Sequence, residues 1–213
     1  HDLPFNLSAL TPSATAAWGD PRSIILDHTI LPFFLPFQST QHALEAFQAM
    51  EGKALGSLKY RLGLLTGRFG AEHPLKACSG CMEADLASHG VAYWHLSHQY
   101  PGVLVCPTHG EMLIESNCNR QWSRRLQLIL PGESTLAPPH QNPPPESSQL
   151  ALKQLAIAVL DLAVSGRHRR FRPDIVRALY RGSLSNGADH LATSFAEHCA
   201  LLQPYPPLTS LPT

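Results

Sequence analysis

The chain has 213 residues, of which 44% are hydrophobic and 15% charged, enough for one large domain or two small ones. Its 16 basic and 16 acidic side chains cancel, so the net charge by itself indicates no particular partner. The longest apolar run, residues 29–37, is too short to span a bilayer and contains two prolines, so we expect no membrane partner. The chain opens on His1 and shows no secretory signal, and we therefore expect a fragment or a chain that lacks disordered ends.

The first 72 residues are expected to be helical. A helix is predicted to begin at Pro21, with Asp20 as its N-cap, because proline suits the first helical position. The two prolines of LPFFLPF, residues 31–37, then favour an extended or kinked stretch.

A second helix is predicted over residues 40–50, where apolar side chains recur at helical spacing and Thr40 can cap the N-terminus. Residues 55–65 can form a further helix. Gly56 and Gly63 weaken that prediction, because glycine in a helix interior is destabilising.

Residues 73–130 contain four of the five cysteines, and we interpret this segment as a zinc-finger module. Cys78 and Cys81 bracket two residues. Cys106 and His109 bracket two more after a gap of 24 residues, inside a segment with the character of a β-hairpin. Two such pairs supply the four ligands of a closed tetrahedral site, which is typical of structural Zn²⁺. Such a site can contribute roughly 10 kcal/mol or more to folding.

Other interpretations of these cysteines remain open. The four side chains can be buried or reactive residues paired by chance, and either His73 or Cys118 can replace His109 as a ligand. Cys118 and Cys199 are more simply small core residues. Disulfides are disfavoured, because the cysteine count is odd and no export signal is present.

The sequence gives no support for catalysis at this site. It contains neither an H-E-x-x-H helix nor the H-x-E and P-C-x-x-C pattern of zinc deaminases. A site with four protein ligands also leaves no position for an activated water. No βαβ pattern surrounds the C-x-x-C pair, so a thioredoxin-like redox role is excluded as well. We therefore expect a protein that is not an enzyme.

Residues 131–147 are rich in proline and are predicted to be a linker or mobile loop. A C-terminal helical region, residues 148–213, is expected to follow. Its clearest helix runs from a cap at Ser148 to Gly166.

A second helix in this region is predicted from Pro173 to just before Gly182, and a third over residues 188–202. The last two have a helix-turn-helix layout, which in DNA-binding proteins places one helix in the major groove.

Between residues 167 and 181 stand six arginines against one acid, Asp174. They are Arg167, Arg169, Arg170, Arg172, Arg177 and Arg181. Arginines grouped in this way can neutralise DNA phosphates and reach base edges, although a solvated basic face is the plainer interpretation. A weaker basic patch comprises Lys76, Arg120, Arg124 and Arg125.

Aromatic and histidine side chains around the cysteines have a structural and a functional interpretation. Tyr93, Trp94 and Trp122 can stack on bases, but packing over a small zinc site is the simpler role. His95 and His98 are expected to be hydrogen-bonded structural residues, because four better ligands already exist.

The middle of the chain resembles the TnsD/TniQ family of transposon target-selection proteins. That family's motif reads C-P-x-C, an acidic residue, then G-x-x-Y-W-x-x-x-H-Q-x-P-G-V-x-V-C-x-x-H-G. Here it stands as CSGC, Asp85 and GVAYWHLSHQYPGVLVCPTHG. Weaker similarity extends to ILDHTILPFFLPF upstream and to RFRPDIVRALYRGSL downstream.

This resemblance implies a mainly α-helical fold with a small zinc-bound β-hairpin module and a helix-turn-helix-like C-terminal region. Residues 1–72 would be the helical part of the TniQ-like domain. The four cysteine and histidine positions match the family's metal ligands. Two departures stand out: CSGC lacks the usual proline after Cys78, and the family's first N-terminal segment, which helps to engage an AAA+ ATPase, is expected to be missing.

The resemblance also implies a function. Family members bind attachment-site double-stranded DNA and recruit the AAA+ regulator of transposition, which in turn brings in the transposase. They act in the bacterial cytoplasm. The C-terminal extension favours the TnsD-like branch, which binds its DNA target directly. Two alternatives remain: an adaptor that docks on an RNA-guided complex without reading DNA itself, and a metal-dependent hydrolase with an unrecognised site.

Overall fold

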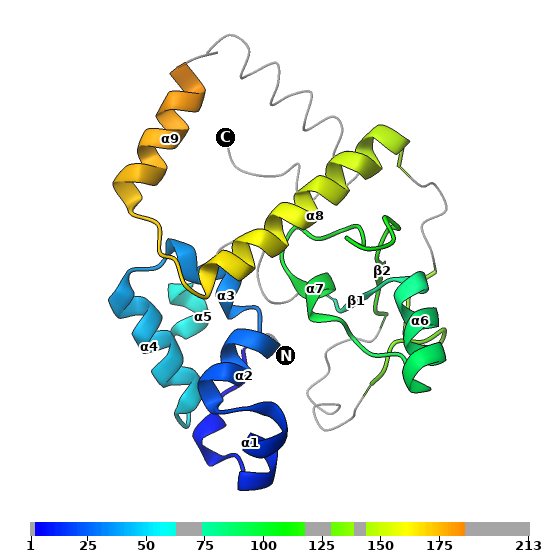
Figure 1. Cartoon of the computed structure of the whole chain (residues 1–213), viewed down its shortest axis with the longest axis horizontal. Coiled ribbons are helices and arrows are strands. Elements are labelled where there is room, and N and C mark those ends of the chain that lie inside the picture. The colour runs from blue at the N-terminus through cyan, green and yellow to red at the C-terminus, as the bar shows by residue number, and fades with distance from the viewer. Residues whose placement is uncertain (1–2, 63–73, 118–128, 139–143, 186–213) are drawn as a thin grey trace. The chain divides into compact units, whose positions relative to one another are not determined.

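The computed structural model describes residues 3–62, 74–117, 129–138 and 144–185. The chain divides into two compact units, the first comprising His1–Ala71 with Leu160–Thr213 and the second Glu72–Val159 (Figure 1). The sequence placed boundaries after residues 72, 130 and 147. The structure divides the chain near the first of these and again within its longest helix, which the sequence had assigned as a whole to the C-terminal region.

The first unit opens with two elements that the sequence did not indicate, η1 (Leu7–Ala9) and α1 (Pro12–Trp18). The next helix, α2 (Pro21–His28), confirms the prediction made from its N-terminus. The Asp20 carboxylate accepts a hydrogen bond from the Ser23 amide at 2.8 Å, and proline occupies the first turn.

Residues 31–37 are helical, so the extended alternative predicted from their prolines is wrong, while two successive short helices are compatible with the kinked alternative. They form α3 (Leu31–Phe34) and η2 (Leu35–Phe37), and each proline lies in a first turn, where its missing N–H is not needed. Thr29 joins α2 to α3, since its hydroxyl donates to the Ile25 carbonyl at 2.6 Å and accepts from the Leu31 amide at 3.2 Å. The two prolines, Pro32 and Pro36, are buried in the core of this unit.

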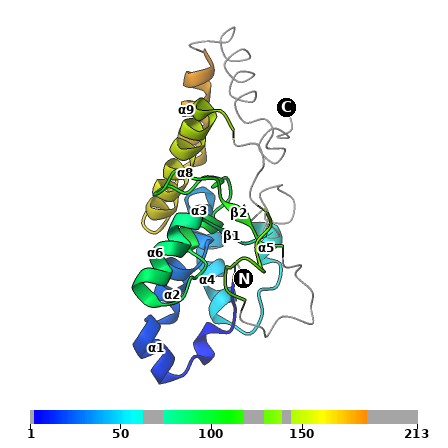
Figure 2. The ribbon, with the colours of Figure 1, turned by 90° about the vertical axis from the view of Figure 1, so that its right-hand side faces the viewer.

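Helix α4 (Thr40–Glu51) confirms the predicted helix but begins with a different cap. The hydroxyl of Ser39, rather than that of Thr40, accepts the His42 amide at 3.1 Å. Within the described part of the predicted helix over 55–65, the structure has α5 (Leu58–Arg61), with Gly56 at φ +54° just before it, and residues 63–65 lie outside the described residues. Within this unit α2 contacts α1, α3 and α4 (Figure 2).

The C-terminal helices are α8 (Glu146–Gly166) and α9 (Pro173–Ser185). Ser148 is a buried residue in the first turn of α8 and not its cap, because the helix begins two residues earlier. Gly182 lies inside α9 and does not end it. By length and composition α8 could cross a membrane, although Leu152 and Ala156 on it are fully buried against the rest of the chain.

The second unit comprises the strands β1 (Lys76–Ala77) and β2 (Ile114–Glu115), the helices α6 (Ser79–His89) and α7 (Leu96–Gln99), and the part of α8 up to Val159. The strands pair antiparallel, with Lys76 opposite Glu115. Val105 and Met112 form a further antiparallel bridge, which confirms the expected hairpin. The fold is mainly helical with a small sheet, as predicted.

Part of the segment that the sequence assigned to a linker is held by the second unit. Leu136 forms an antiparallel bridge with Ser116, and the Ala137 amide donates to the Glu115 carbonyl at 2.8 Å. Residues 135–137 therefore lie against the end of β2, because their backbone groups find partners there.

Candidate metal centre

The first cysteine pair lies where β1 runs into α6. Cys78 is the N-cap residue of that helix, and Cys81 lies in its first turn. The unpaired N–H groups and positive dipole end of a helix N-terminus stabilise thiolates. The chain therefore turns from strand to helix at the point where two sulfurs can face one ion.

The second pair lies in the turn of the hairpin. The Gly110 amide donates to the Cys106 carbonyl at 2.8 Å, and the His109 amide points at the Cys106 sulfur at 3.4 Å. Gly110 adopts φ +75°, a conformation that favours glycine, and lets the chain leave the turn. The Cys106 amide donates to the Glu111 carbonyl at 2.8 Å and closes the hairpin.

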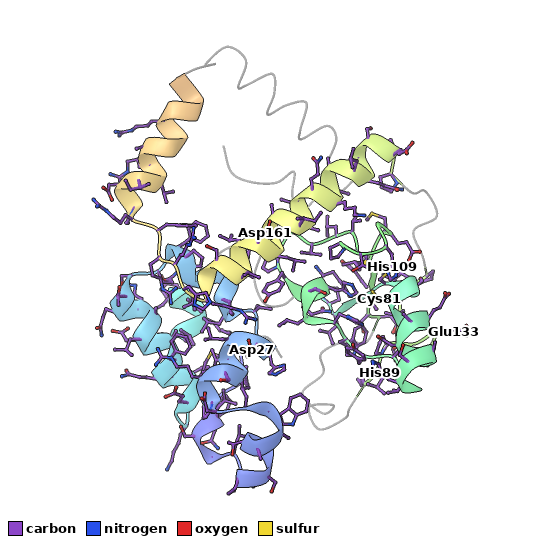
Figure 3. The ribbon with its side chains drawn as sticks, in the orientation of Figure 1. Asp27, Cys81, His89, His109, Glu133 and Asp161 are labelled. Atoms are coloured by element: carbon purple, nitrogen blue, oxygen red, sulfur yellow. The ribbon has the colours of Figure 1, made fainter. Side chains whose placement is uncertain are left out.

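The four predicted ligands come together. Their ligand atoms lie within 4.8 Å of one another, and Figure 3 shows Cys81 and His109 side by side at the start of α6. His109 Nδ1 is 3.4 Å from the sulfurs of Cys78 and Cys81. Cys106 Sγ is 3.7 Å both from Cys81 Sγ and from His109 Nδ1.

These separations suit a single tetrahedral ion. Four ligands at the Zn–S and Zn–N distances of about 2.3 and 2.0 Å lie roughly 3.5–3.8 Å apart. Three sulfurs and one imidazole nitrogen are also the donor set that Zn²⁺ prefers. The cluster can therefore hold a metal ion, and its chemistry is consistent with zinc.

The three cysteines are buried, whereas His109 is exposed and covers the site on its outer side. Burial raises the pKa of Cys78, and burial, assisted by Cys106, raises the pKa of Cys81 to about 11. Both groups are therefore protonated thiols at neutral pH in the metal-free fold. A metal must displace those protons, since only thiolates are ligands.

Two residues that the sequence did not single out also shape the site. A carboxylate oxygen of Glu111 lies 3.3 Å from both the Cys78 sulfur and the Gly80 amide. Gly80 itself faces the His109 ring, because a Cβ built there would lie 3.0 Å from the ring's Cγ. The position of Gly80 between the two cysteines was the one sequence signal that could have identified it.

His95 and His98 lie behind the cysteines. His95 Nε2 is 2.9 Å from the buried carboxylate of Asp85, whose second contact is the Tyr93 amide at 3.4 Å. His98 is 1% exposed, and its Nε2 is 3.7 Å from the Cys81 sulfur. Burial, followed by the neighbouring His95, lowers the pKa of His98 to about 4, so its ring is neutral at neutral pH.

The aromatic residues divide between packing and exposure. The Tyr93 ring stacks on His95 with centroids 4.4 Å apart and remains 42% exposed. Trp94 is half-buried and donates from Nε1 to the Ile129 carbonyl at 2.6 Å. These contacts join separate parts of the second unit.

Several sequence predictions fall outside the described residues. They concern the rival ligands His73 and Cys118, the core assignment of Cys199, the aromatic Trp122, three members of the second basic patch (Arg120, Arg124 and Arg125), and the helix over 188–202. The helix-turn-helix layout of the C-terminal region therefore stays a prediction. The fourth member of that patch, Lys76, is buried, and its ammonium group donates to the carbonyls of Tyr100 and Val103, which corrects its assignment to an exposed patch.

Three of the six arginines already have partners within the chain. Arg167 pairs with Asp27 at 2.6 Å, and Arg172 pairs with Asp174 at 2.6 Å. Arg170 donates to the carbonyls of Gly166 and Arg169 at 2.7 and 2.8 Å, and burial lowers its pKa. Arg170 therefore caps the C-terminal end of α8.

The other three arginines are exposed, and within the part of the chain that the structure describes they make no ion pair or side-chain hydrogen bond. Arg169 lies in the connection between α8 and α9. Arg177 and Arg181 lie one turn apart on α9, which places both on the same side of that helix. These three are the side chains most available to an anionic partner.

Comparison with known proteins identifies related sequences. Residues 8–113 match the family model described as TniQ. The chain is also similar to the Transposon Tn7 transposition protein TnsD of Escherichia coli, with 28% identity over 92 residues. That alignment covers 43% of this chain and 18% of the relative, so the chain spans less than a fifth of it. The TniQ match includes all four candidate ligands and ends before the six arginines.

Proposed function

Since this chain belongs to the TniQ/TnsD family, we propose that it is a target-site selection protein of a bacterial transposon. In this role it binds attachment-site double-stranded DNA and recruits the AAA+ regulator that brings in the transposase. It acts in the bacterial cytoplasm, where it associates with the nucleoid and does not bind a membrane. The observation that carries the proposal is the Cys₃His cluster, assembled within the segment that matches the family.

The metal in this proposal is structural Zn²⁺. Cys78, Cys81, Cys106 and His109 occupy all four positions of a tetrahedral ion and leave none for a reacting water. The ion joins the start of α6 to the turn of the hairpin. It thereby stabilises a unit whose paired strands are two residues long, and the protein works by binding rather than by catalysis.

Contact with DNA is assigned to the exposed arginines. Within the described residues, Arg169, Arg177 and Arg181 are in no ion pair that a phosphate would have to displace. Arg167 and Arg172 can also contribute to the local positive charge, but each would exchange an internal carboxylate for a phosphate. Arg170 supports the segment by capping α8.

A second candidate function is an adaptor that docks on an RNA-guided complex and leaves DNA recognition to that complex. The observation favouring it is that half of the arginines are bound internally. The TniQ match also stops before this region, so the family assignment itself does not require the arginines to touch DNA.

A salt titration distinguishes the two functions. If the arginines bind DNA, duplex affinity should fall with salt, and each phosphate contact should contribute about 0.9 to the slope of log K against log salt concentration. Replacing Arg169, Arg177 and Arg181 together by alanine should flatten that slope. Lys53→Ala, which removes an exposed charge from the first unit away from this segment, is the control. Equal slopes for the triple variant and the wild type would favour the adaptor.

A further inference from the structure

The short helix α7 lies between the two cysteine pairs in sequence, and it contacts Cys81 and the strand that leads to Cys78. Its last two residues are His98 and Gln99. His98 reaches Cys81 through Nε2, at 3.7 Å from the sulfur. His98 does not belong to the group of four ligand atoms that lie within 4.8 Å of one another. It therefore lies behind a ligand rather than beside the ion.

The surroundings of His98 decide which ring nitrogen carries the proton. Its Nδ1 is buried and has no hydrogen-bond partner within the described part of the chain. A neutral imidazole has one N–H and one acceptor nitrogen. A buried N–H without an acceptor is rarer and costlier than an unpaired acceptor, so the proton belongs on Nε2, facing the Cys81 sulfur.

Gln99 forms hydrogen bonds with the backbone of the strand that leads to Cys78. Its Oε1 accepts from the Lys76 amide at 3.0 Å, and its Nε2 donates to the Lys76 carbonyl at 2.8 Å. The same amide group donates to the His95 carbonyl at 2.9 Å. Gln99 thus bonds both backbone groups of Lys76 as a neighbouring strand would, immediately before the chain reaches Cys78.

We propose that α7 clamps the first cysteine pair of the metal centre, with His98 and Gln99 as positioning residues. His98 donates Nε2–H to the Cys81 thiolate, and Gln99 holds the strand that delivers Cys78. The clamp rests on the zinc centre proposed above, but it does not depend on what the protein binds.

The clamp has a physical role because the centre is anionic. Three thiolates and one neutral imidazole around Zn²⁺ leave a net charge of minus one in a largely buried site. A hydrogen bond to a thiolate disperses part of that charge and orients the sulfur, and the same bond lowers the sulfur's nucleophilicity. A substitution of His98 should therefore affect the reactivity and zinc coordination of Cys81 more than those of the other three ligands.

Zinc affinity tests His98 first, by competition with a chromophoric chelator. His98→Phe keeps the ring volume but removes the donor, and we expect it to raise the zinc Kd by roughly 10–100-fold. His98→Gln can place an amide N–H near the position of Nε2 and should restore most of the affinity. His98→Asn, whose shorter amide cannot reach the sulfur, should behave like phenylalanine. His89→Phe, on the exposed end of α6, is the matched control.

Site-resolved alkylation of the zinc-loaded protein provides a measurement that general loosening would not reproduce. With His98→Phe, modification of Cys81 should accelerate relative to Cys78 and Cys106, as followed by peptide mass spectrometry. Gln99→Leu should instead accelerate Cys78 selectively, because the strand before it is released. Equal acceleration of all three cysteines in both variants would contradict the clamp.

A measurement on the wild-type protein keeps the proposal testable if the variants do not fold. Nitrogen-15 NMR of the zinc-loaded protein should show His98 as the Nε2–H tautomer, and an Nδ1–H tautomer would overturn the proposal. Metal analysis distinguishes a failure of the proposed zinc centre from a failure of the clamp. A wild-type protein that binds no zinc contradicts the metal centre itself, whereas unchanged zinc affinity and Cys81 reactivity in a folded His98→Phe variant contradict only the clamp.

Discussion

At the scale of single residues, the centre depends on the space left between the two cysteines of the first pair. Gly80 provides that space. A Cβ there would meet three atoms of the His109 ring at 3.0–3.1 Å, closer than ordinary side-chain contacts allow. The ring is exposed and can move aside, but a displaced ring no longer presents Nδ1 to the three sulfurs.

Gly80→Ala is therefore expected to weaken zinc binding about tenfold while leaving the metal-free fold largely unchanged. Chelator competition and far-ultraviolet circular dichroism measure the two effects. Ser79→Ala, one position earlier on the exposed side of α6, is the control and should bind as the wild type does. An unchanged zinc affinity in Gly80→Ala would show that His109 does not depend on this space.

The protonation of the cysteines gives a second prediction at this scale. Because the pKa values of Cys78 and Cys81 are raised in the metal-free fold, both thiols carry protons until well above neutral pH. Each zinc ion bound at pH 7 should thus release at least two protons, and apparent affinity should rise with pH. Calorimetry in buffers of different ionisation enthalpy counts these protons. Release of fewer than one would mean that the thiols are already ionised.

At the scale of helices, N-cap residues and close backbone contacts determine where the helices begin and end. The N-cap of α4 is Ser39, not Thr40, because the side chain one residue before the helix accepts the amide of His42. The last residue of α8 lies against the turn formed by α3 and η2. A Cβ on Gly166 would lie 1.8 Å from the Pro32 carbonyl oxygen, which belongs to the backbone and cannot rotate away.

Ser39→Ala should cost about 1 kcal/mol of unfolding free energy through loss of the cap, whereas Thr40→Ala should cost little. Urea denaturation followed by circular dichroism compares the two variants. A larger effect of the Thr40 substitution would restore the cap that the sequence suggested.

Gly166→Ala should destabilise the protein by about 3 kcal/mol or more, because the added methyl group forces two backbone segments apart. Gly132→Ala is a matched control, since a Cβ there meets nothing within 4 Å, and it should be neutral or slightly stabilising. Thermal unfolding of both variants measures the difference. Similar melting temperatures would mean that α8 ends elsewhere in solution.

At the scale of the whole molecule, the two units differ in what stabilises them. The first unit has a conventional apolar core that includes Ile25, Leu31 and Met50, all fully buried. The second has a sheet whose two strands are each two residues long, and it gathers three buried cysteines at one point. A metal bound by these cysteines would cross-link the start of α6 to the hairpin and stabilise this unit.

Removal of zinc with a strong chelator should therefore loosen the second unit selectively. Amide hydrogen exchange should accelerate across residues 74–117, while the amides of α4 stay protected. Hydrogen exchange with mass spectrometry measures both in one experiment, and added zinc should reverse the change. Uniform acceleration along the whole chain would show instead that the ion stabilises both units.

By itself the sequence determined the features that depend on neighbours a few residues apart. The spacing of Cys78 to Cys81 and of Cys106 to His109 identified the cluster, because a ligand pair in a tight turn is a local arrangement. Asp20 and the apolar spacing of residues 40–50 identified helices for the same reason. The prolines of 31–37 misled the prediction, since a proline that starts a short helix and one that extends the chain look alike in sequence.

Only the tertiary structure decided which distant groups meet. It brought the Gly80 backbone against His109, joined His98 to Cys81, and paired Arg167 with Asp27. None of these contacts follows from periodicity or composition, because each depends on how segments far apart in the chain pack. The number of arginines left exposed and without an internal partner in the described part of the chain therefore depends on the fold and could not be read from the sequence.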